Sequence, residues 1–266
     1  MSMSKKLILP FIIDFKNENI GIYTSSQLKQ KWNNPLSFRG IEEGRFKVVK
    51  MDGEKVLQAK SLKGKVGPTE GGGSWKLKLG RGYDELYVRY KVMFPKGFNF
   101  TRGGKLPGLG GGSSPGGGSK DTDGFSARIM WRVNNFENKH KIKNSYKAYI
   151  CQYVYYPEKD PKKNWGLDIN WSNPKTGNKI YIVPGKWHTI KIRVKLHVGK
   201  DLIESWLDGN KVLSKKLTLR GENQKFGIDN LSFSVFFGGN TPSWAPKKTE
   251  YIYFDDFMIS DKDIKQ

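Results

Sequence analysis

Two segments carry arginine or tyrosine side chains two or four residues apart, a spacing that places side chains on one face of a β-strand. In Gly124–Val133 the polar face holds Ser126, Arg128 and Arg132, while the alternate positions are apolar. In Lys147–Tyr156 the same rule gives a row of three tyrosines: Tyr149, Tyr153 and Tyr155. Guanidinium groups bind carboxylates, and phenol hydroxyls can donate or accept a proton. These two faces predict a site that binds an anion and moves protons.

The tyrosine row has a second interpretation, because such rows more often pack in a core or an interface. Here Ile150 and Val154 on the opposite face of Lys147–Tyr156 already supply core side chains. The tyrosines are then available to line a groove.

A glycine-rich segment precedes both strands. Gly103–Gly118 contains nine glycines in sixteen residues around one cation, Lys105. Such a composition usually indicates a flexible spacer, but the sequence Leu106-Pro107-Gly108-Leu109 is too apolar and too specific for a spacer. No GKS or GKT follows, which excludes a phosphate loop. We predict a loop that lets a long polymer approach the backbone closely.

A third predicted strand, Trp187–Val198, carries cations on one face: Lys191, Arg193 and Lys195. Three like charges in a row repel one another unless solvent or a polyanion screens them. The strand is therefore either a solvated outer face or a basic floor beneath a bound anionic polymer.

Other catalytic chemistries lack their residues. No G-x-S-x-G motif marks a serine hydrolase, and the three histidines are scattered, with Cys151 as the single cysteine. No carboxylate pair lies on the polar strand faces, as a glycosidase would need. We expect no catalytic metal and no required cofactor. The pairs Asp121/Asp123 and Asp255/Asp256 could help to hold a structural calcium ion, although turns and strand ends are their commoner use.

The elements that must position these residues are strands, since period-two alternation recurs between Gly, Pro, Asn and Asp clusters. Asp208-Gly209-Asn210 is a hairpin signal, and no linker divides the chain, so we predict one all-β domain over residues 1–266, a β-jelly roll sandwich of two antiparallel sheets with a cationic cleft. The expected strands are Phe46–Met51, Val56–Ser61, Ser74–Leu79, Glu85–Pro95, Gly124–Val133, Lys147–Tyr156, Lys179–Val183, Trp187–Val198, Leu202–Leu207, Lys211–Leu219, Leu231–Phe237 and Tyr251–Ile259.

Composition agrees with this picture. The 266 residues include 47 Lys and Arg against 25 Asp and Glu, a formal net charge of +22 that calls for an anionic partner. With 36% hydrophobic residues the chain can build a core, and no stretch approaches the roughly 20 apolar residues of a membrane span. The apolar segment after Lys5 and Lys6 has no cleavage site and is expected to be a strand rather than a signal peptide. We expect a soluble monomer, and the compartment stays open, since a virion-associated or lysis-released protein needs no signal peptide.

A groove of Lys, Arg and Tyr suits β-elimination in a uronic-acid polysaccharide. The cations neutralise the carboxylate, and tyrosines remove the C5 proton and protonate the leaving O4. The sequence does not decide which tyrosine is the base, and Lys105 could itself be an acid or base. The ordered motifs GGKLPGL, SARIMWR and YVYYP, within Gly103–Pro157, resemble signatures of the alginate lyase and glucuronan lyase type of polysaccharide lyase (families 14 and 20). The resemblance implies a β-jelly roll and an active site of Lys105, Ser126, Arg128, Tyr153 and Tyr155.

Around these catalytic candidates we expect substrate-binding side chains: Arg132, Tyr149, Lys191, Arg193 and Lys195. Tyr149 is also the alternative if the tyrosine register shifts. The basic stretch between Val133 and Tyr146, with Lys139, His140, Lys141 and Lys143, is expected to alter cleft length or substrate choice.

Two other functions remain open from sequence. A non-catalytic domain could bind an acidic polysaccharide in the same groove, with Trp165 and Trp171 as aromatic platforms. Nucleic-acid binding is suggested by charge alone, and no recognition motif supports it, so we expect no nucleic-acid partner. Uronate preference and endo or exo action are not set by these motifs.

Overall fold

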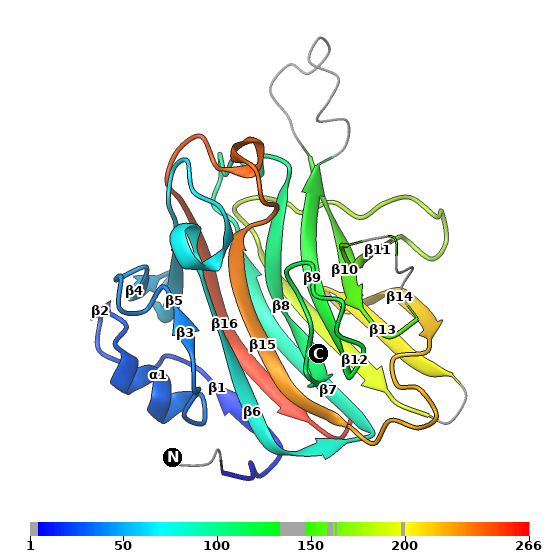
Figure 1. Ribbon diagram of the computed structural model, residues 1–266. Helices are drawn as coiled ribbons and strands as arrows, with labels where there is room; N and C mark the ends of the chain where they lie inside the picture. The colour runs from blue at the N-terminus through cyan, green and yellow to red at the C-terminus, as the bar shows by residue number, and fades with distance from the viewer. Residues whose placement is uncertain (1–4, 134–146, 159–161, 163, 198–199, 266) are drawn as a thin grey trace.

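The computed structural model describes residues 5–133, 147–158, 162, 164–197 and 200–265. Two antiparallel sheets face each other and enclose the core (Figure 1). The prediction of an all-β sandwich of two antiparallel sheets is confirmed. The basic stretch expected between Val133 and Tyr146 lies outside the described residues, as does Val198.

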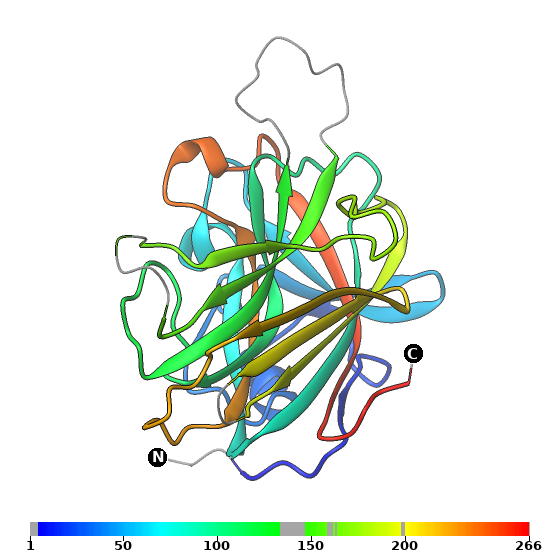
Figure 2. The same cartoon turned by 90° about the vertical axis from the view of Figure 1, so that its right-hand side faces the viewer.

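The sheet that carries the candidate site has seven strands in the described part of the chain, in the order β11-β10-β9-β8-β15-β6-β3. The strands of this sheet are β3 (Phe38–Arg39), β6 (Gly73–Tyr83), β8 (Gly103–Gly112), β9 (Gly124–Val133), β10 (Ala148–Tyr155), β11 (Leu167–Asn170) and β15 (Ile228–Phe237). Figure 2 shows the same cartoon after a quarter turn about the vertical axis.

The second sheet has nine strands among the described residues, in the order β14-β13-β12-β7-β16-β5-β4-β2, with β1 paired to β16. Its strands are β1 (Phe11–Ile13), β2 (Gly21–Ile22), β4 (Phe46–Met51), β5 (Glu54–Ser61), β7 (Glu85–Met93), β12 (Trp187–Lys195), β13 (Asp201–Leu207), β14 (Asn210–Leu217) and β16 (Glu250–Ser260). The predicted Lys179–Val183 strand is wrong: only isolated bridges form there, from Tyr149 to Tyr181 and from Ser172 to Lys179.

The core forms where the apolar faces of the two sheets meet. Phe125, Ile129 and Trp131 of β9 are fully buried, as are Ile190 and Val194 of β12 in the opposite sheet. Alternation therefore assigned the faces of these strands correctly. Because the inner faces are apolar, the polar residues at alternate positions are left on the outer faces of the sandwich.

Within the described residues, three short helices lie outside the sheets. They are α1 (Ser25–Lys31), the single π-turn η1 (Gly67–Gly71) and the 3-10 turn η2 (Pro242–Trp244). Thr24 and Gln27 form a capping box at the start of α1. The Thr24-to-Gln27 spacing is a sequence signal for this helix, which the predicted set of strands does not include. No helix in the described part of the chain has the length and apolar character of a membrane span.

The glycine-rich segment is mostly a strand, which corrects the predicted loop. Gly103–Gly112 is β8, in the middle of the seven-stranded sheet, and only the residues after it form a loop. A Cβ at Gly104 would lie 2.1 Å from the Trp131 ring, and one at Gly108 would lie 2.2 Å from the Ala127 carbonyl oxygen. The glycines are needed because neighbouring groups pack directly against the β8 backbone.

The basic row of β12 does not lie beneath the site, contrary to one of its two predicted interpretations. β12 belongs to the nine-stranded sheet, where Arg193 pairs with Glu85 and Glu204, and Lys195 pairs with Glu85. Lys191 pairs with Asp263. The three cations form ion pairs on the outer face of that sheet and do not line the cavity described below.

Candidate active site

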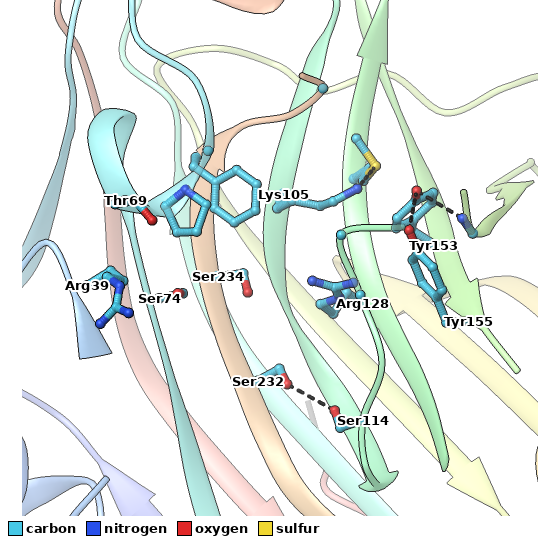
Figure 3. A pocket seen from close by; sticks show the side chains of 18 of the residues that line it. Arg39, Thr69, Ser74, Lys105, Ser114, Arg128, Tyr153, Tyr155, Ser232 and Ser234 are labelled. Carbon is cyan, nitrogen blue, oxygen red and sulfur yellow. Dashed lines mark hydrogen bonds between the residues drawn. The ribbon is translucent and has the colours of Figure 1, made fainter. Parts of the chain in front are cut away.

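A cavity of about 930 Å³ opens on the outer face of the seven-stranded sheet. Every strand of that sheet contributes to its lining, from Arg39 of β3 to Asp168 of β11. Figure 3 shows Lys105, Arg128 and the tyrosine pair on one side of it. The basic lining residues are Arg39, Lys76, Lys105, Arg128 and Arg132, and Asp168 is the acidic lining residue among the described residues.

Lys105 projects from β8 opposite Met130 of β9. Its ammonium nitrogen contacts the Met130 sulfur and lies 3.3 Å from the centroid of the Tyr153 ring. The side chain is buried, and burial together with the nearby charges of Arg128 and Arg132 lowers the pKa of Lys105 well below its usual value. A lowered pKa makes the neutral amine available as a base.

Arg128 lies on β9, directly across the strand pair from Tyr153 of β10. Its side chain is buried, yet Nε and Nη2 have no hydrogen-bond partner in the described part of the protein. A buried donor without a partner costs free energy, more so when it is charged. The guanidinium is therefore suited to an anionic ligand that enters the cavity.

The Tyr153 and Tyr155 hydroxyls lie 3.3 Å apart, within hydrogen-bond distance. The Gly166 N–H donates to the Tyr153 oxygen and the Gly118 N–H donates to the Tyr155 oxygen, both at 3.0 Å. Burial and the hydrogen bond to Tyr155 raise the pKa of Tyr153. Tyr153 therefore stays protonated over the neutral and moderately alkaline range and can serve as a proton donor.

Ser126 does not line the cavity, although it shares the β9 face with Arg128. Its hydroxyl donates to the Pro115 carbonyl at 2.6 Å, and its side chain is buried. Residues 113–118, here called the cover loop, are also held by Lys76, which donates to the Ser113 and Ser114 carbonyls at 3.2 Å. Ser126 thus fixes the cover loop.

The cover loop in turn packs on the catalytic candidates. A Cβ added at Gly116 would lie 2.4 Å from Arg128 Nη2. Gly118 supplies the N–H that binds Tyr155. The cover loop therefore fixes the positions of both the guanidinium and one phenol.

Asp168 is a site residue that the sequence reasoning missed. One Arg132 nitrogen lies 2.7 and 3.0 Å from its two carboxylate oxygens. Its strand, β11, has only four residues, too short for alternation to reveal; the pairing of Asp168 with Tyr153 across the strands places it in the cavity. The ion pair fixes Arg132 beside the Tyr153 ring, whose centroid is 5.8 Å away.

The other predicted residues are divided between cavity and core. Tyr149 is not part of the lining and instead contacts the Tyr181 ring and lies under Lys179. Trp165 lines the cavity and is 47% exposed, but Trp171 is fully buried and cannot be a platform. Trp244, which sequence reasoning missed, also lines the cavity.

The acidic pairs form no metal-binding cluster in the structure. Among the described residues, no group of three His, Cys, Asp or Glu side chains is placed to hold a metal ion.

Comparison with solved structures shows the fold. The alginate lyase Aly36B superposes with a TM-score of 0.76 at 21% identity, over 97% of this chain and all of that one. Alginate lyase vAL-1 from Chlorella virus gives 0.66 at 22% identity, covering 91% of this chain and 99% of its own. The PL-14 alginate lyase from Aplysia kurodai gives 0.66 at 22% identity, with coverages of 90% and 96%.

Sequence comparison gives the family. No curated protein is a significant match to the chain. The model of the family described as polysaccharide lyase 14 matches residues 49–257, which include the strands β8, β9 and β10 that carry Lys105, Arg128 and the tyrosine pair. The chain therefore belongs to the polysaccharide lyase 14 family.

Proposed function

We propose that this chain cleaves a uronate polysaccharide by β-elimination, with alginate, glucuronan or glucuronate-containing algal cell wall as the substrate class. The observation that carries the proposal is the buried guanidinium of Arg128, which has unpartnered nitrogens next to a lysine of lowered pKa and a pair of tyrosines. Relatives support the substrate class, because variants of Aly36B were solved with an alginate trisaccharide and with an alginate tetrasaccharide.

The first requirement of the reaction is neutralisation of the uronate carboxylate. Negative charge develops on this group when the adjacent C5 proton leaves, and prearranged cations stabilise it in a site that excludes water. Arg128 supplies two unpartnered nitrogens for this purpose. Arg132 is held by its ion pair with Asp168 and adds positive charge beside the Tyr153 ring.

The second requirement is a base for the C5 proton. Lys105 suits this role better than the tyrosine expected from sequence, because burial raises the pKa of Tyr153 but lowers the pKa of Lys105. The Lys105 amine is therefore neutral in a range where an exposed lysine is charged. The amine takes the proton, the C5–H electrons form the C4–C5 double bond, and the bond from C4 to the leaving oxygen breaks.

The third requirement is an acid for the leaving O4. Tyr153 is kept protonated by its raised pKa and is hydrogen-bonded to Tyr155. One phenol of this pair donates its proton to O4, so the proton lost from C5 is balanced by the one gained at O4. Ser126 contributes by holding the cover loop rather than by touching the sugar.

A substrate panel tests the proposal. Alginate, polyglucuronate and glucuronate-containing cell walls are incubated with the protein, and the unsaturated uronate is followed by its ultraviolet absorbance. We expect a rise with at least one polymer, and loss of that rise in Lys105→Gln but not in Lys91→Gln, which removes a cation paired with Asp256 away from the cavity. Saturable binding of the polymers without any product would instead support the non-catalytic binding function.

A further inference from the structure

The cavity extends far beyond the catalytic candidates, on one side only. Arg128 lies on β9, two strands from the β11 edge and four strands from the β3 edge. Strands lie about 4.8 Å apart, so the lining continues for about 10 Å on one side of Arg128 and about 19 Å on the other. Apart from Lys105 on β8, next to Arg128, the long side holds none of the proposed acid and base groups.

The long side has a row of polar residues in direct cross-strand register. Ser234 of β15 lies opposite Ser74 of β6, and Ser74 lies opposite Arg39 of β3. All three line the cavity, and Figure 3 shows them in line, leading away from Arg128. We call Ser234, Ser74 and Arg39 the distal row.

The distal row faces the cavity because its neighbours face the core. Trp75 directly follows Ser74, and Phe233 directly precedes Ser234. The rings of Trp75 and Phe233 are buried and stack with their centroids 4.0 Å apart. Alternation then sends Ser74 and Ser234 to the opposite face. Hydroxyl groups on a surface are suited to the hydroxyl and ring oxygens of a sugar.

Arg39 has no carboxylate partner among the described residues. In this it differs from Arg132, which is paired with Asp168, and from Arg45, which is paired with Glu43. The one side-chain hydrogen bond that Arg39 makes in the described structure is to the Phe38 carbonyl at 3.1 Å. Its charge is available for a ligand, and a planar guanidinium suits a carboxylate.

We propose that the distal row is a second binding site for the uronate chain, where Arg39 pairs with the carboxylate of a sugar residue several positions from the one held by Arg128. This inference rests on the proposed function and adds to it where the chain is held. A polymer lying across the strands would contact both arginines, while a short oligosaccharide at the catalytic groups would not reach Arg39. Cleavage therefore takes place near one end of the bound stretch, and long chains are preferred.

The test compares Arg39→Gln with Arg81→Gln, which removes another exposed arginine that lies outside the cavity. For each variant, kcat/KM is measured on the polymer and on the shortest oligosaccharide that is cut. We expect Arg39→Gln to lower the ratio of polymer to oligosaccharide kcat/KM by about threefold or more, mainly through KM, as for the loss of one charged contact. Arg81→Gln should leave the ratio unchanged. An unchanged ratio in Arg39→Gln, or equal losses of kcat/KM on both substrates, would contradict the proposal that the distal row binds the uronate chain.

Ser74→Ala gives a second measurement, since it removes a hydroxyl of the same row without altering charge. It should lower the same ratio, and thermal unfolding verifies that each variant is folded. If the wild-type protein cuts no polymer at all, the proposed function fails separately. Affinity electrophoresis through gels containing alginate or polyglucuronate then tests polymer binding by the distal row separately from catalysis. The polymer should retard Arg39→Gln less than Arg81→Gln, and equal retardation of the two variants would contradict binding by the distal row.

Discussion

Gly116→Ala is expected to displace the guanidinium of Arg128 without disturbing the fold. The new Cβ would lie 2.4 Å from Nη2, 3.0 Å from Cζ and 3.1 Å from Nη1 of Arg128. An ordinary contact begins at 3.4 Å, so the nearest atom must move by 3.4 − 2.4 = 1.0 Å. A misplacement of about 1 Å in a group that positions substrate can cost about 100-fold in rate. The cost in stability should be small, because the atoms that move are the end of a flexible side chain.

The assay is the rate of unsaturated product formation together with thermal unfolding. Gly221→Ala is the matched control, because its Cβ would meet only Gln224, at 3.5 Å or more. It should keep full activity and an unchanged melting temperature.

A double-mutant cycle shows whether the loss acts through Arg128. In an Arg128→Gln background, Gly116→Ala should add little further loss. A full 100-fold loss in that background, or wild-type activity in Gly116→Ala alone, would refute the positioning role of the cover loop.

Three further predictions concern single groups. Because the pKa of Lys105 is lowered and its neutral form is the proposed base, kcat should rise as the pH rises through that lowered pKa. The pH dependence of kcat tests this, and a maximum at about pH 5 would contradict the role of Lys105 as the base. Ser126→Ala should lower kcat and cost about 1 kcal/mol of stability through the lost bond to Pro115, and Ser126→Thr should restore kcat; activity equal to wild type in the alanine variant would rule the role out. Burial raises the pKa of Asp255 from 3.8 to about 6, so the native state binds more protons than the unfolded state and stability falls as pH rises through that window. Asp255→Asn should abolish this fall in melting temperature, and an unchanged pH dependence would contradict the shift.

The sequence was sufficient to predict the strands that hold the arginine and the tyrosines. Period-two spacing put Arg128 on one polar face and Tyr153 with Tyr155 on another, and the strand register places Arg128 opposite Tyr153. The residues were predictable because their apolar neighbours are core residues of long strands, where alternation is strong.

The location of the basic strand could not be predicted from its sequence. Alternation assigns Lys191, Arg193 and Lys195 to one face, but both sheets have an outer face, and periodicity does not say in which sheet a strand lies. Pairing of β12 with β7 and β13 decides this, and pairing depends on contacts between distant parts of the chain.

The strand that carries Lys105 was hidden for another reason. Its composition is typical of a flexible loop, and strand propensity is low for glycine. In the folded protein Gly104 and Gly108 are required by the close approach of Trp131 and the β9 backbone. Tertiary packing, rather than local preference, makes this segment a strand.

The origin of the new chain end tests the account most directly. A uronate polymer is digested in water enriched in heavy oxygen, and the products are weighed by mass spectrometry. β-Elimination adds no water, so we predict products that carry an unsaturated uronate and no heavy oxygen from bond cleavage. Saturated products that contain one heavy oxygen for each bond cut would show hydrolysis and would contradict the proposed roles of Lys105, Arg128 and the Tyr153–Tyr155 pair.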